Sequence, residues 1–100
     1  MIKKNKVEIY VPVVSPLMFG NAIETLSRMF GGATLIDARG YWIDDSNTMV
    51  NDKIKIVYSY CGNEELAENM QELYGYCKTL KSVLKQDCIL LVINNEARFI

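Results

Sequence analysis

The sequence predicts one α+β domain in which two helices cover one face of a four-stranded antiparallel sheet. Its 100 residues, half of them apolar, suffice for one hydrophobic core and are too few for two. Two segments alternate apolar and polar residues with the period of a strand, and two others repeat apolar residues at helical spacing. Two further short segments are rich in strand-forming residues, and the order of all six segments specifies the fold.

The first strand is predicted over residues 7–13, where apolar residues occupy every second position. Ser15 followed by Pro16 is typical of a helix start, because serine caps free backbone N–H groups and proline is tolerated at the first helical position. The apolar stripe of this helix consists of Phe19, Ile23, Leu26 and Phe30. Gly31 and Gly32 follow at once, so we expect the helix to end there.

Residues 33–44 form the predicted second strand, with a bulge or bend at Gly40. Residues 52–61 form the third, which makes a hairpin with the second across Asp44 to Asp52. One face of the third strand carries Ile54, Ile56, Tyr58 and Tyr60, and the other carries Lys53, Lys55, Val57 and Ser59.

A second helix is predicted after Gly62, with Asn63 as its cap and an end near Lys85. Its core face consists of Leu66, Met70, Leu73, Cys77, Leu80 and Leu84. Residues 88–94 are expected to form a buried fourth strand, and residues 95–100 a tail.

Strand, helix, strand, strand, helix, strand is the order of the ferredoxin-like βαββαβ sandwich. Right-handed crossovers then give the strand order 4-1-3-2, with both helices on one face, in a single domain over residues 1–100.

The fourth strand is apolar on both faces, which is unusual for a domain of two layers. We therefore expect a partner to cover Leu90 and Val92, and a homodimer is the simplest partner for a small protein. Phe99 is expected either to join this interface or, with Ile100, to fold back over the strand.

The composition excludes several classes of function. Because the formal net charge is −1, no bulk field attracts nucleic acid or membranes, and the chain has no apolar run that could span one. Because histidine is absent, the common histidine-dependent catalytic groups are absent too. The odd number and wide spacing of the cysteines favour buried thiols over disulfides, which agrees with a cytoplasmic protein. We also expect no metal and no cofactor.

A polar group on the hairpin is the leading candidate for a ligand site. Asp37 and Arg39 share one face of the second strand, and Tyr41 continues the row if Gly40 adds no bulge. Tyr10 and Tyr58 would line the same pocket if paired sheets enclosed it. The alternative is an ordinary surface ion pair, which contributes little to stability.

The segment from Gly32 through Thr34, Asp37 and Gly40 to Trp42 resembles the Gly-Leu-Thr…Asp-x-x-Gly-x-Trp stretch of an uncharacterised bacterial family of small, mostly exported proteins. Ala33 stands where that family has leucine, and this chain lacks an export signal. The resemblance implies a similar hairpin and no particular activity.

Three functional hypotheses remain. The first is a non-enzymatic, homodimeric binding module, such as a bacterial, plasmid or phage accessory protein that sequesters a small ligand or binds a protein. The alternative is a small histidine-free enzyme of the dimeric α+β-barrel type, with a pocket on the open face of the sheet. Nucleic-acid binding by the lysines and aromatic residues is the third, although the third strand lacks the signature of RNA-recognition modules.

Overall fold

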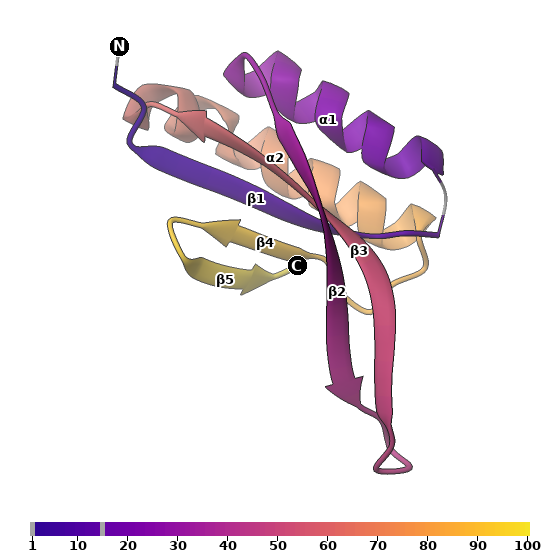
Figure 1. Cartoon of the computed structure of the whole chain (residues 1–100). Coiled ribbons are helices and arrows are strands. Elements are labelled where there is room, and N and C mark those ends of the chain that lie inside the picture. Colours follow the sequence, from indigo (N-terminus) through magenta and orange to yellow (C-terminus); the bar gives the residue numbers. More distant parts are fainter. Residues whose placement is uncertain (1, 15) are drawn as a thin grey trace.

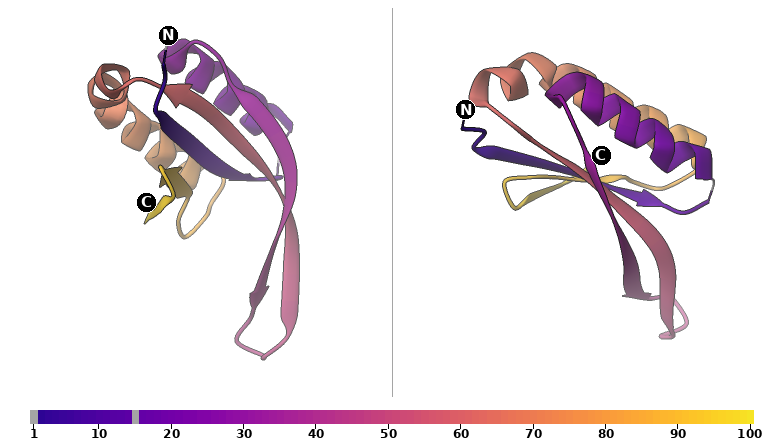
Figure 2. Two further views of the ribbon diagram at one scale, coloured as in Figure 1. Left: turned by 60° about the vertical axis from the view of Figure 1, so that its left-hand side comes forward. Right: turned by 45° about the horizontal axis from the view of Figure 1, so that its top comes forward.

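The computed structural model describes residues 2–14 and 16–100, without the side chains of residues 16–19. Its elements are β1 (Asn5–Pro12), α1 (Pro16–Phe30), β2 (Thr34–Ile43), β3 (Met49–Cys61), α2 (Asn63–Val83), β4 (Leu90–Ile93) and β5 (Glu96–Phe99). The strands form one antiparallel sheet in the order β2-β3-β1-β4-β5, and both helices lie on one of its faces (Figures 1 and 2). The predicted α+β class and the order 4-1-3-2 of the first four strands are confirmed.

The sheet has one strand more than predicted, because residues 96–99 form β5 and not a tail. β5 pairs with β4 from Ile93↔Glu96 to Leu90↔Phe99, so only Asn94 and Asn95 connect the two strands. Both asparagines have positive φ, 51° and 69°, which is the pattern of a type I′ turn. Asparagine tolerates this conformation better than most residues, so the Asn-Asn pair sends the chain back along β4.

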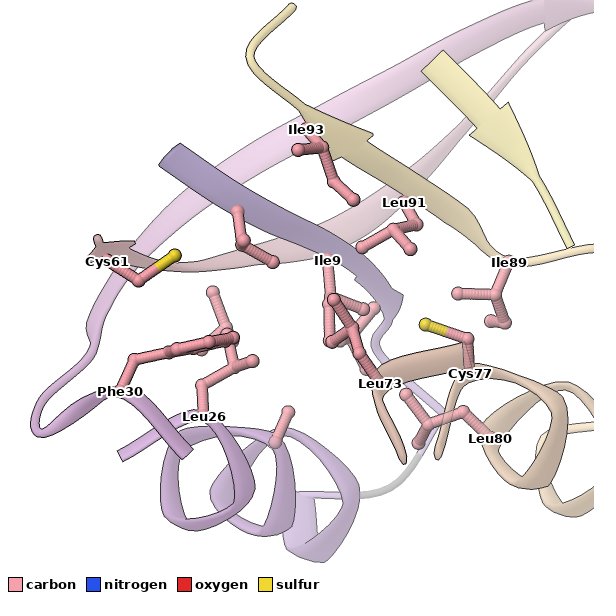
Figure 3. Close-up of a cluster of buried hydrophobic side chains, with 14 of the residues drawn as sticks. Ile9, Leu26, Phe30, Cys61, Leu73, Cys77, Leu80, Ile89, Leu91 and Ile93 are labelled. Carbon is pink, nitrogen blue, oxygen red and sulfur yellow. The ribbon is translucent and has the colours of Figure 1, made fainter. Parts of the chain in front are cut away.

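The core lies between the sheet and the two helices (Figure 3). Alternate residues of β1 point into it, and Val7, Ile9 and Val11 are completely buried. Most of the predicted stripes are buried: Leu26 and Phe30 from α1, and Leu73, Cys77 and Leu80 from α2 with Leu84 just after it. The predicted Ile23, Leu66 and Met70 are only partly buried, and Ala22, which was not predicted, is fully buried. Each large side chain buried in this way contributes about 1.5–3 kcal/mol, which makes this layer the main source of stability.

Helix α1 ends where the glycines predict. Gly31 has φ of 90°, and its N–H donates to the carbonyl of Ser27 at 2.8 Å. A residue with a β carbon is strained in this left-handed conformation, so glycine is required here. The helix begins at Pro16 as predicted, whereas the proposed capping residue Ser15 and the side chain of Phe19 lie outside the described residues.

Helix α2 begins at Asn63, so Asn63 is its first residue and not, as predicted, the capping residue before it. Gly62 is the capping residue, and its N–H donates to Oε1 of Glu65 at 2.9 Å. The side chain of Asn63 instead accepts a hydrogen bond from Nδ2 of Asn5 at 2.9 Å. Asn63 therefore ties the start of α2 to the central strand of the sheet.

The β2–β3 hairpin projects beyond the two helices (Figure 1), and we call its outer part, residues 37–55, the arm. The arm makes the molecule elongated, with extents of 48 × 25 × 22 Å. Pairing continues without interruption from Thr34↔Tyr58 to Ile43↔Met49, so the predicted bulge at Gly40 is wrong. At the tip, Oδ1 of Asp44 accepts hydrogen bonds from the N–H groups of Ser46 and Thr48, as expected for a turn.

Candidate functional site

Asp37, Arg39 and Tyr41 lie in one row on the arm, as the period of the strand predicts. The register places Lys55 opposite Asp37 and Lys53 opposite Arg39. This row is on the same sheet face as the buried residues of β1, but it lies beyond the end of the helices. It is therefore a polar, accessible continuation of the face that forms the core.

The contacts in this row differ from a simple Asp–Arg pair. The carboxylate of Asp37 forms an ion pair with the ammonium of Lys55. The side chain of Lys55 is only 22% exposed, whereas that of Asp37 is 79% exposed. Nη1 of Arg39 donates to Oδ1 of Asn51 at 3.0 Å. One carboxylate and three cations of the arm thus lie together, with Asp37 and Arg39 held by different partners.

A hollow of about 600 Å³ lies at the base of the arm, and we call it the arm-base hollow. Its lining consists of Val13, Asp37, Ala38, Arg39, Lys53, Ile54 and Lys55. The N–H of Val13 donates to the carbonyl of Lys53 at 3.1 Å, which extends the β1–β3 ladder to this point. The hollow is within the usual size range of small-molecule sites and combines charged groups with apolar walls.

Tyr10 and Tyr58 lie on the opposite, open face of the sheet. There the ammonium of Lys6 lies 4.3 Å from the ring centroid of Tyr58, and the Tyr58 and Tyr60 rings meet edge to face at 5.8 Å. Within one chain, the five predicted ligand residues therefore form two groups. Asp37, Arg39 and Tyr41 form one, and the two tyrosines belong to the other.

The predicted interface residues Leu90, Val92 and Phe99 also lie on the open face. Leu90 and Val92 are half-buried, and Phe99, beside Leu90 on the neighbouring strand, is 70% exposed. The C-terminal residues extend the sheet sideways and do not fold over this face. Ile100 packs instead against the core, and its backbone exchanges two hydrogen bonds with Ile89.

Two of the three cysteines are buried, as expected, whereas Cys88 is exposed. Burial raises the pKa of Cys77 from 9.0 to about 12. Burial, and then the nearby Glu65 carboxylate, raise the pKa of Cys61, although the ammonium of Lys3 acts in the opposite direction. Because nucleophilic cysteines react as thiolates, neither buried thiol is suited to catalysis at neutral pH.

Within residues 2–14 and 16–100, no three His, Cys, Asp or Glu side chains are grouped so that they could hold a metal ion. Neither helix in the described part of the chain has the length and hydropathy needed to cross a membrane.

Sequence reasoning missed the part of Lys53, Lys55 and Val13 in the candidate site. The alternation of residues 52–61 already placed both lysines on one face of the third strand. Placing them beside Asp37 and Arg39 also required the register of the hairpin, which depends on the length of the turn at its tip.

No protein-family model matches the sequence, and no curated protein is similar to it. Among solved structures, the chain is similar to a phage SAM lyase in complex with S-methyl-5′-thioadenosine, with a TM-score of 0.68 and 13% identity. The alignment covers 96% of this chain and 88% of that chain. The chain is also similar to a structure of phage SAM lyase in the apo state, with a TM-score of 0.67 and 14% identity. That alignment covers 98% of this chain and 89% of that chain. At this identity, the similarity shows a shared fold.

The comparison contradicts our first functional hypothesis. A non-enzymatic binding module is wrong as the preferred interpretation, because the structures that share this fold over nearly its whole length are those of an enzyme. The finding favours the alternative, a small enzyme without histidine.

Proposed function

We propose that this chain is an enzyme that cleaves S-adenosylmethionine and releases S-methyl-5′-thioadenosine. The observation that carries the proposal is the fold shared with phage SAM lyase across 96% of this chain and 88% of that one. The arm-base hollow supports it, because about 600 Å³ is enough for a substrate of this size.

The chemistry of such a reaction suits a protein without histidine. The bond between the sulfonium sulfur and the γ carbon of the methionine part breaks, and the sulfur keeps the electron pair. The substrate's own carboxylate forms the new bond to that carbon and closes a lactone. The departing thioether is neutral and needs no proton, so the protein has to hold a reactive conformation and can dispense with a general acid.

The test is to incubate the purified chain with S-adenosylmethionine and to follow S-methyl-5′-thioadenosine by liquid chromatography and mass spectrometry. We expect an initial rate proportional to protein concentration and well above that of the spontaneous reaction in heat-denatured controls. S-adenosylhomocysteine should stay intact, because its sulfur is a thioether and not a sulfonium. A rate equal to the spontaneous one, with protein that is folded by circular dichroism, would refute the proposal.

We also propose that the chain works as a homodimer in the cytoplasm. Exposed apolar side chains on the open face and the arm support association, since Phe99, Tyr41 and Met49 are each at least 60% exposed. An isolated two-stranded hairpin such as the arm is at best marginally stable in water, so a second copy would stabilise it. The unpaired cysteines are compatible with a reducing compartment. Light scattering that gives a strict monomer would contradict the dimer.

A further inference from the structure

The arm-base hollow has charges of both signs at fixed positions, and no hydrophobic core requires them there. Asp37 and Arg39 are two residues apart on one strand face, and Lys53 lies across from Arg39. The side chain of Asp37 is largely exposed although its carboxylate is paired with Lys55. The carboxylate is therefore held in place by a lysine and can still accept another donor.

The spacing of these charges matches an α-amino-acid group. Side chains two positions apart on one face of a strand are about 7 Å apart. An ammonium and a carboxylate on one carbon, each with a hydrogen bond of about 2.8 Å to the protein, span roughly 8 Å. Asp37 can thus accept from the ammonium while Arg39 and Lys53 donate to the carboxylate.

We propose that the arm-base hollow binds the amino-acid end of its ligand, with Asp37 on the ammonium and Arg39 with Lys53 on the carboxylate. This proposal rests on the proposed function, and it names the part of S-adenosylmethionine that the arm recognises. Of the apolar residues that border the hollow, Val13 lies on the same sheet face as these charges and can meet the less polar part of the ligand, whereas the side chains of Ala38 and Ile54 point to the opposite face. One carboxylate oxygen held by the cations leaves the other oxygen to close the lactone.

The balance of charge favours this ligand over a phosphate. Lys55 is paired with Asp37 and Nη1 of Arg39 bonds to Asn51, so the hollow does not present three cations to a single anion. A phosphate would also lie beside the carboxylate of Asp37, and that contact is repulsive. An amino acid uses the carboxylate and the cations together.

The test compares two ligands that differ in the amino-acid end. S-adenosylhomocysteine carries it and is not cleaved, whereas S-methyl-5′-thioadenosine lacks it. Calorimetry should show that Asp37→Asn and Arg39→Gln each lower the affinity for S-adenosylhomocysteine about tenfold, as expected when a charge-assisted hydrogen bond is lost. Both variants should bind S-methyl-5′-thioadenosine as the parent chain does. Asp45→Asn at the arm tip and Arg28→Gln on α1 are the matched controls and should change neither affinity.

The outcomes separate the two proposals. The amino-acid subsite is refuted, and the proposed function stands, if the parent chain cleaves S-adenosylmethionine and the variants change the affinity for both ligands equally or leave both affinities unchanged. If the parent chain binds neither adenosine compound and has no lyase activity, the proposed function is refuted. In that case the subsite is tested separately, by adding millimolar methionine to the protein and following its amide signals by NMR. Amide shifts at residues 37–39 and 53–55 that Asp37→Asn abolishes would support it, and their absence would overturn it.

Discussion

The Asn94–Asn95 turn gives a sharp test of what holds the fifth strand. Both residues have positive φ, so replacing either with glycine removes a similar backbone strain. Only Asn94 also bonds through its side chain: Oδ1 accepts from the N–H of Lys6 at 2.8 Å, and Nδ2 donates to Oδ1 of Asn5 at 2.8 Å. The difference between Asn94→Gly and Asn95→Gly therefore isolates these two hydrogen bonds.

Each such bond contributes about 1 kcal/mol, so Asn94→Gly should be less stable than Asn95→Gly by about 2 kcal/mol. For a domain of this size the gap corresponds to roughly 10 °C in Tm. Asn95→Gly itself should equal or slightly exceed the parent chain, by about 0.5 kcal/mol at most, because Asn-Gly is the preferred pair in this turn.

Urea unfolding followed by circular dichroism measures the difference, and equal m values for the two variants would show that the midpoints can be compared. Asn5 is 7% exposed, so its oxygen loses a partner without gaining free access to water. A double-mutant cycle of Asn5→Ala with Asn94→Gly should give a coupling energy of about 1 kcal/mol. Equal midpoints for the two glycine variants would refute the assignment of stability to these bonds.

Three more predictions concern the helix end and the thiols. Gly31→Ala should destabilise the protein by about 1 kcal/mol because φ is 90°, whereas Gly32→Ala should be close to neutral in the same urea assay. Burial raises the pKa of Cys77 from 9.0 to about 12, so the thiol keeps its proton in the folded chain at a pH at which the unfolded chain has lost it. The free energy of unfolding should therefore fall as pH rises from 9.0 to about 12, and it should fall less in Cys77→Ala. A thiol reagent should modify Cys88 at once and the other two cysteines only on unfolding; fast reaction of all three would contradict the burial of the other two.

Local patterns were enough to predict most of the fold. The stripe on each helix and the alternation in β1 correspond to the buried faces, because burial of apolar area determines which side of an element faces the core. In β3 the alternation predicted the strand but not its buried face: Tyr58 and Tyr60 lie on the open face, and Val57 and Cys61 lie in the core. β5 was missed for a physical reason. Residues 96–99 alternate polar and apolar residues over only four positions, and their strand exists because Asn94 and Asn95 reverse the chain and β4 offers a free edge.

The candidate site was only half predictable, because it depends on the relation between strands. Sequence spacing correctly placed Asp37, Arg39 and Tyr41 on one face. Whether Tyr58 shares that face depends on the register of the hairpin, in which odd residues of β2 pair with odd residues of β3. A turn longer or shorter by one residue would have reversed this relation, so spacing within a strand could not reveal it.

The position of β1 at the centre of the sheet has a consequence for how the chain folds. β1 pairs with β3 on one side and with β4 on the other, so Val7 meets Ile93 near the far end of the sequence. Such distant pairings must close long loops before they gain contacts, and they slow folding relative to helical domains of equal length. During synthesis, β1 therefore has no β4 neighbour until residues 90–93 have been made. We expect the hairpin and its helix to form early and the sheet to close only when the C-terminal strands are released.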